Sequence, residues 1–325
     1  MSQSAVSSSS TEGSRAGAPR IGRALLVVSG GARRAARAGR EAISACEARG
    51  VSCRVVETRA PRHAVALTRE LTQSDSFDAV FAVGGDGTAM EVVTALADRD
   101  DRPPVGIVPA GTANVLARTI GVPMRPARAV TALLDGEVAR LDLGRTADGS
   151  RFAIGLGVGL DAAMIAGASA RLKRRLGYLA YALSAARAGL GLRRFRARLT
   201  VDGKSHEIDT ASVLIANFGA VLGGLVRFGD GILHDDGLLN ACVYSPRSRL
   251  DAARILWRML RGNIDCDRCF FTLSGRHFTL EIDPAGHAQA DGELLGLTPL
   301  EVTVEPGAAT LLVPRGKHNR MTMKL

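Results

Sequence analysis

Short apolar runs alternate with longer amphipathic segments through the first third of the chain. Each run is of strand length and ends in a turn or loop rich in Gly, Pro, Ser or Thr. The runs occupy 24–28, 51–57, 79–83 and 104–108. Segments with helical periodicity follow the first three runs, at about 33–49, 63–71 and 89–97. A strand, a loop and a helix repeating in this order predict a doubly wound, Rossmann-like α/β sheet.

The pattern changes beyond residue 141. Short strand candidates follow one another with turns between them, and two helical segments interrupt. The strand candidates are 152–159, 196–201, 212–216, 238–244, 270–273, 278–282, 300–304 and 309–313, and the helices are 171–189 and 249–261. Many strands at short spacing predict a β-rich domain, either a sandwich or a partly open barrel.

These patterns divide the chain into four parts. Residues 1–22 are polar and Ser-rich, which is typical of a disordered tail. We predict an α/β domain over 23–141 and the β-rich domain over 142–313. Residues 314–325 form a basic tail without a clear assignment.

Composition narrows the choice of partners. The chain carries 42 Lys and Arg against 32 Asp and Glu, a formal net charge of +10. This excess favours an anionic partner such as a nucleotide, a nucleic acid or an acidic bilayer. The five cysteines have no disulfide-framework spacing and fit a reducing cytoplasm. No apolar run reaches the ~20 residues needed to span a membrane, so we expect a soluble or peripheral protein.

The most informative motif is Gly84-Gly85-Asp86-Gly87-Thr88, which directly follows an apolar run. Glycines let the backbone approach a ligand closely, and successive amides then bind phosphate at a helix N-terminus. Asp86 within such a cradle implies a Mg²⁺ ion or a water between its carboxylate and the phosphates. The alternative is a tight turn in which Asp86 caps the helix.

A second loop, Pro109-Ala110-Gly111-Thr112-Ala113-Asn114, also follows an apolar run. Adjacent parallel strands would place both loops around one crevice. Thr112 is a candidate donor to phosphate. Asn114 either orients the phosphate or caps the next helix.

Two acidic turns lie in the predicted β-rich domain. One contains Asp235 and Asp236, and the other is Asp291-Gly292-Glu293. Each is either a plain β-turn, since Asp-Gly is a common hairpin signal, or a source of the metal ligand and general base that phosphoryl transfer requires.

Taken in order, five motifs resemble the diacylglycerol kinase catalytic family, which includes bacterial lipid kinases and the sphingosine and ceramide kinases. They are the Gly84–Thr88 loop, the 109–118 segment, the Gly-rich 155–162 segment, Asp236-Gly-Leu-Leu239 and Asp291-Gly-Glu293. The resemblance spans about residues 24 to 313. It implies an ATP-binding domain, a lipid-substrate domain and a cleft between them that holds ATP.

The resemblance also implies roles for individual residues. Mg²⁺ would be held by Asp236 with the backbone carbonyls of Leu233 and Leu238. Asp291 would accept the proton of the lipid hydroxyl, with Glu293 as the alternate base or metal partner. The nucleotide-binding positions would be Thr58, Gly84, Gly85, Asp86, Gly87, Thr88, Ala89, Met90 and Thr112.

The sequence departs from this family in its first loop. Relatives begin with Asn-Pro-x-Ser-Gly, whereas this chain has Val28-Ser29-Gly30-Gly31. The loop remains Gly-rich, but the Asn-Pro pair is missing. This departure puts the details of nucleotide binding in doubt. Asn240 stands where the family commonly has Asp, and the 228–231 segment replaces the usual Pro-Ala before the acidic turn. Because that segment is expected to contact the substrate, the identity of the lipid is the least transferable feature.

The partners expected are a membrane lipid substrate, an anionic membrane surface in the cytoplasm and a possible second copy of the chain, with no nucleic acid. A basic segment with Tyr residues at 171–183, followed by 193–196, is the sequence's candidate for membrane contact. It is alternatively a helix packed on the sheet with a solvated basic face. An NAD kinase and a non-catalytic lipid- or nucleotide-binding regulator are the alternative functions.

Overall fold

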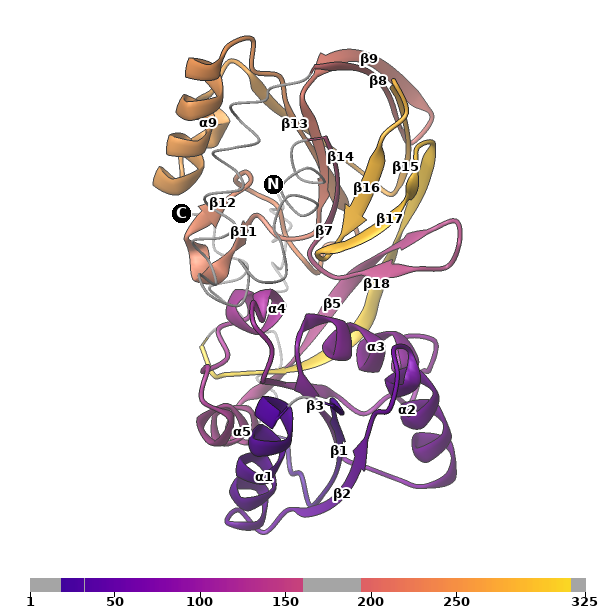
Figure 1. The fold of residues 1–325 in the computed structure, drawn as a ribbon, viewed down its shortest axis with the longest axis vertical. Coiled ribbons are helices and arrows are strands. Elements are labelled where there is room, and N and C mark those ends of the chain that lie inside the picture. The colour runs from indigo at the N-terminus through magenta and orange to yellow at the C-terminus, as the bar shows by residue number, and fades with distance from the viewer. Residues whose placement is uncertain (1–18, 32, 160–193, 317–325) are drawn as a thin grey trace, which may run out of the picture.

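The computed structural model describes residues 19–31, 33–159 and 194–316. An α/β lobe and a β-rich lobe lie one above the other (Figure 1). This arrangement confirms the predicted fold class. The predicted helix at 171–189 and most of the predicted tails at 1–22 and 314–325 lie outside the described residues. Within the described part of the chain, no helix is long and apolar enough to cross a bilayer.

Four parallel strands form the centre of the α/β lobe, in the order β2-β1-β3-β4. They are β1 (Arg23–Val28), β2 (Ser52–Glu57), β3 (Ala79–Gly84) and β4 (Val105–Pro109). The three inner strands are almost completely buried because helices cover both faces of the sheet. α1 (Arg33–Glu47) packs beside α5 (Pro126–Leu134), and α2 (His63–Ser74) packs beside α3 (Asp86–Leu96). The four strands therefore end at one edge, where their loops meet.

The β-rich lobe is built from two layers of antiparallel strands. One layer has the order β14-β13-β10-β7-β16-β17, and the other contains β15, β8 and β9. The bounds are β6 (Arg151–Phe152), β7 (Gly155–Gly159), β8 (Phe195–Val201), β9 (Lys204–Thr210), β10 (Ser212–Ala216), β13 (Leu239–Tyr244), β14 (Phe270–Gly275), β15 (His277–Asp283), β16 (His287–Ala290) and β17 (Glu293–Leu297). Buried Leu, Val and Phe side chains from both layers share one core.

Shorter elements lie around these layers. They are α4 (Val115–Thr119), β11 (Ala220–Val221), the 3₁₀ turn η1 (Leu222–Gly224), β12 (Val226–Arg227), α9 (Arg249–Arg261) and the 3₁₀ turn η2 (Ile264–Cys266). α4 lies at the boundary between the lobes, and α9 lies at the outer edge of the β-rich lobe (Figure 1).

Two long strands belong to both lobes. β18 (Leu300–Val313) pairs with β15 at one end and with β4 at the other, and β5 (Glu137–Thr146) pairs with it along most of its length. The predicted strands at 300–304 and 309–313 are thus one strand. A shift of register between Glu305 and Ala309 bends it where Pro306 and Gly307 interrupt the pattern.

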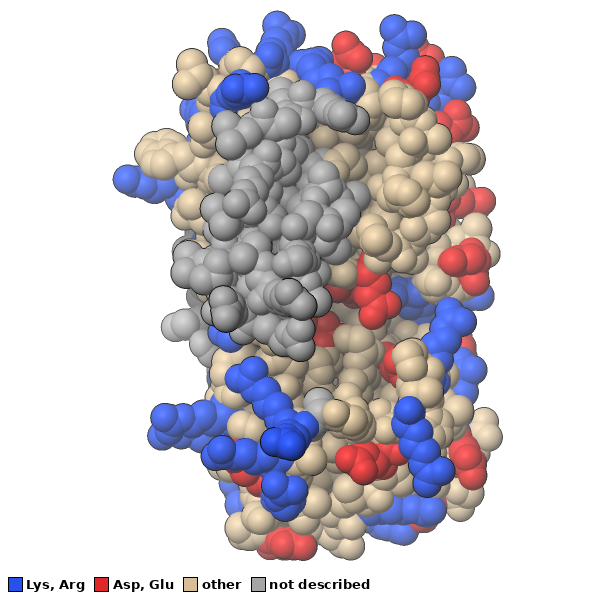
Figure 2. Space-filling view, in the orientation of Figure 1, with Lys and Arg blue, Asp and Glu red and all other residues tan. Residues whose placement is uncertain are grey.

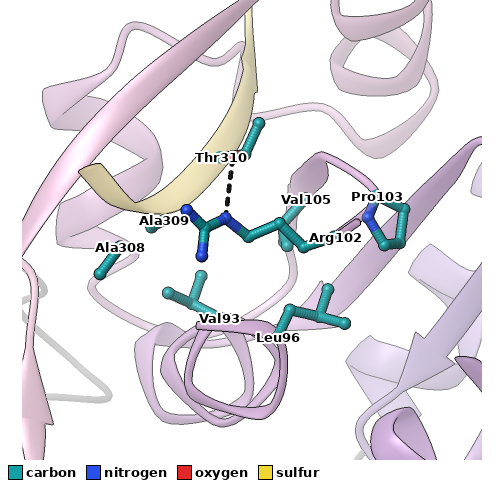
Figure 3. Close-up of a pocket in the computed structure, with 8 residues that line it drawn as sticks. All are labelled: Val93, Leu96, Arg102, Pro103, Val105, Ala308, Ala309 and Thr310. Carbon is teal, nitrogen blue, oxygen red and sulfur yellow. Dashed lines mark hydrogen bonds between the residues drawn. The ribbon is translucent and has the colours of Figure 1, made fainter. Parts of the chain in front are cut away.

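Arg102 fixes this bend to the α/β lobe. Its guanidinium lies across a depression at the base of β18 and donates to the Thr310 hydroxyl at 3.2 Å (Figure 3). It also donates to the carbonyls of Ala97 and Gly307, both at 2.8 Å. The depression is therefore a structural anchor, and it lies away from the loops at the carboxyl edge of the sheet.

The structure corrects several predicted elements. α3 begins at Asp86, whereas the periodicity placed its start near Ala89, because the Gly-rich loop enters the helix directly. α4, α5, β5, β9, β16 and β17 were not predicted. β9 and β17 are largely exposed strands. The sequence of β9 lacks the apolar run that identifies a strand, whereas β17 has Leu residues in a short segment directly after the Asp-Gly turn.

Candidate active site

The loops that follow the four parallel strands converge at the carboxyl edge of the sheet. The Gly30 amide donates to the Thr58 hydroxyl at 3.0 Å. A Cβ atom built on Gly30 would lie 1.8 Å from the Thr58 carbonyl oxygen, so this position requires glycine. The loop that lacks Asn-Pro is therefore held by Thr58, one of the predicted nucleotide-binding residues.

The two Gly-rich loops pack backbone against backbone. The Gly84 carbonyl accepts from the amides of Ala110 and Gly111, at 2.7 and 3.1 Å. A Cβ atom on Gly111 would lie 2.5 Å from the Cα atom of Gly85. The small residues at these positions therefore allow the loops to form one continuous surface at the N-terminus of α3.

Asp86 links the first Gly-rich loop to the helix that follows the second. Its carboxylate accepts from the Leu116 amide at 3.0 Å, at the N-terminus of α4. Burial raises the pKa of Asp86, and hydrogen bonds from α4 amides oppose that rise. Asp86 is thus a helix cap, but it caps the neighbouring helix α4 and not α3, whose first residue it is.

Asn114 occupies the N-cap position of α4, yet its side chain does not cap the helix. Its amide group closes the second loop, accepting from the Gly111 amide at 2.9 Å and donating to the Gly111 carbonyl at 3.0 Å. Its left-handed backbone, with φ 49°, suits this tight turn. The sequence left phosphate orientation and helix capping open for Asn114. The structure adds this third role.

The remaining predicted nucleotide positions differ in accessibility. Thr88 folds back so that its side chain lies under Gly84. Thr112 is exposed at the tip of its loop, whereas Ala89 is buried and Met90 packs against the core. Among these four predicted positions, Thr112 has the most accessible side chain and Ala89 the least.

Asp291 lies at the turn between β16 and β17, where Asp291 and Gly292 both have positive φ. The Asp-Gly pair is therefore a hairpin turn, which was one of the two alternatives that the sequence left open. Its carboxylate accepts three backbone amides, from Ala153 at 2.7 Å, Ile154 at 2.9 Å and Gly155 at 3.1 Å. A hairpin turn does not exclude a functional role for the carboxylate, because the turn orients the Asp291 side chain toward these amides.

Burial raises the pKa of Asp291 to about 6, and the nearby charge of Asp86 adds to the rise. The three amides oppose it, since they stabilise the ionised form. A carboxyl group with this pKa is ionised at neutral pH and can still accept a proton, as a general base must.

Glu293 brings a second carboxylate to the Gly-rich loop. A Cβ atom on Gly87 would lie 3.2 Å from a carboxylate oxygen of Glu293. The hairpin of the β-rich lobe therefore reaches the N-terminus of α3 in the other lobe. Figure 2 shows acidic side chains at this boundary between the lobes.

The other acidic turn is organised by a residue that the sequence analysis did not single out. Asp142, on β5, is buried and accepts from the amides of Gly237 and Gly307 at 2.7 and 2.6 Å. Its own amide donates to the His234 carbonyl at 2.8 Å. The sequence did contain a signal for the special role of Asp142, because an acidic residue between two apolar residues, Leu141 and Leu143, is unusual within a buried strand.

This turn offers oxygen ligands for a hard cation. Burial raises the pKa of Asp236, and the charges of Asp142 and Asp235 raise it further. A divalent cation would offset this repulsion, and Mg²⁺ prefers carboxylate and carbonyl oxygens. Among the described residues, no three metal-ligating side chains converge on one point. The ligand set that the family resemblance implies, Asp236 with the carbonyls of Leu233 and Leu238, therefore stays a prediction.

The sequence also missed the amides of 153–155, for which no side-chain pattern gives a signal. Asn217 holds that segment in place, donating from its buried amide to the carbonyls of Asp142 and Ala153 at 2.7 and 2.9 Å. Asn217 thereby joins the segment that binds Asp291 to the strand that organises the other acidic turn.

Two family models match the chain. The diacylglycerol kinase catalytic domain matches residues 23–146, and the YegS C-terminal NAD kinase beta sandwich-like domain matches residues 155–313. A diacylglycerol kinase of Mycobacterium tuberculosis is 30% identical over 251 residues, covering 73% of this chain and 77% of the relative.

Another relative and a solved structure are also similar to this chain. An uncharacterized protein of Synechocystis is 27% identical over 246 residues, covering 74% of this chain and 56% of that longer relative. A diacylglycerol kinase structure from Bacillus anthracis superposes with a TM-score of 0.69 at 20% identity, covering 91% of this chain and 98% of that one. At this identity the likeness shows the fold.

The close approach of the two Gly-rich loops generates a stability prediction. Gly111→Ala should lower the free energy of unfolding by about 1–3 kcal/mol, because its Cβ atom meets the backbone of Gly85 and neither loop can move cheaply. Urea unfolding would measure the change. Gly85→Ala is the matched control, since its Cβ atom would lie 3.5 Å from Gly111, an ordinary contact. Equal losses in both variants would contradict this packing.

Proposed function

Because the chain belongs to the diacylglycerol kinase catalytic-domain family, we propose that it is an ATP- and Mg²⁺-dependent lipid kinase that acts on a diacylglycerol-type hydroxyl. The observation that carries this proposal is the position of Asp291. Its carboxylate is fixed by three amides, has a pKa of about 6 and interacts with Asp86 beside the Gly-rich loops. In this proposal Asp291 is the general base, and the Gly-rich loops beside Asp86 bind the phosphates.

The proposed reaction is an in-line transfer. The lipid hydroxyl gives its proton to Asp291 while its oxygen forms a bond to the γ-phosphorus of ATP. The bond between that phosphorus and the bridging oxygen breaks, and ADP leaves. The amides at the N-terminus of α3 bind the phosphates, and its helix dipole favours their negative charge.

Magnesium would neutralise charge that develops on the phosphates. In this proposal Asp236, with the carbonyls of Leu233 and Leu238, holds a cation that stabilises the acidic turn. Glu293 stays the alternate base or metal partner, since its carboxylate lies over Gly87. Both assignments are carried over from the family resemblance, and carboxylate and carbonyl oxygens are ligands that suit Mg²⁺.

The acceptor can be identified by phosphate transfer from γ-labelled ATP. We expect label in an organic-extractable product when vesicles contain diacylglycerol, and none when they contain phosphatidylcholine alone. Chelating Mg²⁺ should abolish the transfer, and adding it back should restore it. Free NAD, offered in parallel, tests the NAD kinase alternative. Label in a water-soluble NADP-like product, or in no product, would contradict the proposal.

The pKa of Asp291 predicts the pH dependence of catalysis. A general base must be ionised, so kcat/KM should fall about tenfold per pH unit below pH 6 and level off above it.

Asp86→Asn keeps an oxygen that can cap α4 but removes a charge that raises the pKa of Asp291. The acid limb should therefore move to lower pH in this variant. An acid limb that moves to higher pH would contradict the coupling.

A further inference from the structure

Within the described parts of the chain, the contacts that hold α9 against the β-rich lobe come from one side of the helix. Ser248 caps its N-terminus by accepting from the Asp251 amide at 3.1 Å. On the inner side, Ile255 is buried and Arg254 donates to the buried carboxylate of Asp267 at 2.8 Å. These contacts fix the rotation of the helix about its axis, so its outer side has a defined composition.

The outer side of α9 is an apolar stripe. Leu250 is 82% exposed, Trp257 52% and Leu260 50%. With Ala253, also exposed, these side chains span roughly 80° of the helix circumference at 3.6 residues per turn. Three large apolar side chains on one narrow face are not explained by packing within the described chain.

Arginines border the stripe on both sides. Viewed down the helix axis, Arg249 lies on the same border of the stripe as Leu260, although it is at the other end of the helix. Arg261 lies on the opposite border, with its guanidinium 4.9 Å from the centre of the Trp257 ring. Arg247 and Arg268 are also exposed, and both lie near Asp251 at the N-terminal end of α9. Figure 2 shows basic side chains at the outer edge where α9 lies.

We propose that this face of α9 docks on a bilayer that contains anionic lipids. A helix that lies in the membrane interface combines a Trp- and Leu-bearing face with basic borders. Arginines then meet lipid phosphates while the stripe enters the headgroup region. This inference rests on the proposed function in one respect: a lipid kinase must bind a membrane because its lipid substrate is there.

Charge alone does not single out this face. Exposed arginines also lie on α1 and at the start of α5, including Arg37, Arg40, Arg125 and Arg128. Figure 2 shows a group of basic side chains on the α/β lobe. No exposed large apolar residue accompanies them among the described residues. α9 has both exposed arginines and exposed large apolar side chains, and this combination favours a bilayer over a ligand that binds through charge alone. The candidate at 171–183 lies outside the described residues.

Trp257 is the single tryptophan of the chain, so its fluorescence reports on this face directly. We expect its emission to shift to shorter wavelength on titration with phosphatidylglycerol–phosphatidylcholine vesicles. Brominated phosphatidylcholine should quench it. Emission that stays unchanged at saturating lipid would overturn the proposal, whether or not the protein sediments with the vesicles. An equal blue shift on raising the protein concentration without vesicles would also overturn it, because a second copy would then cover the stripe.

Variants assign the binding to α9. Leu250→Gln with Leu260→Gln keeps the Trp257 reporter, and Arg249→Gln with Arg261→Gln removes two basic charges. Each pair should weaken vesicle partitioning by about tenfold or more. Arg125→Gln with Arg128→Gln removes the same charge from α5 and should change partitioning by less than about threefold. The reverse ranking would place the docking surface on α5.

Activity separates this proposal from the proposed function. On short-chain diacylglycerol dissolved below its aggregation concentration, the α9 variants should match the wild-type kcat/KM within about twofold, because no bilayer is involved. A wild-type protein that binds vesicles through Trp257 but transfers no phosphate would contradict the kinase proposal and support the docking face. An active enzyme whose Trp257 emission stays unchanged would support the kinase proposal and contradict the docking face.

Discussion

The β5–β18 ladder is the constraint on which the rest of the structure depends. It runs through both lobes, so the position of the β-rich lobe is fixed relative to the Gly-rich loops. Arg151 strengthens the junction. Its side chain is only 6% exposed and forms ion pairs with Glu305 on β18 and with Asp98 after α3. Removing Glu305 would leave the largely buried guanidinium without its better-shielded partner, which is unfavourable, whereas Asp98 is 57% exposed and its attraction is screened by water.

The same junction leads directly to the candidate base. Arg151 begins β6, which pairs with β5, and the chain then supplies the amides of 153–155 that hold Asp291. Gly144 is required at this pairing, since a Cβ atom there would lie 2.0 Å from the Phe152 ring. The carboxylate of Asp291 is therefore positioned through backbone geometry, with little dependence on flexible side chains.

Much of the fold was predictable, because buried parallel strands leave continuous apolar runs such as 79–83. The α/β order and the β-rich second half followed from these runs. What the sequence could not show was chemistry made by the backbone. The amides that bind Asp291 belong to Ala153, Ile154 and Gly155, whose side chains give no hint of it. Likewise, the capping of α4 by Asp86 depends on tertiary contact, so local rules placed the cap on Asn114 or on α3.

The most direct test of the account is Asp291→Asn, with kcat and ATP affinity measured on the same sample. If Asp291 accepts the proton, kcat should fall by about 10²–10⁴-fold while the dissociation constant for ATP stays within about twofold, since the proposed nucleotide contacts lie on the other lobe. Glu281→Gln, an exposed position on β15 of the same lobe, is the matched control and should retain full activity. A kcat for Asp291→Asn within tenfold of the wild type would contradict the central claim.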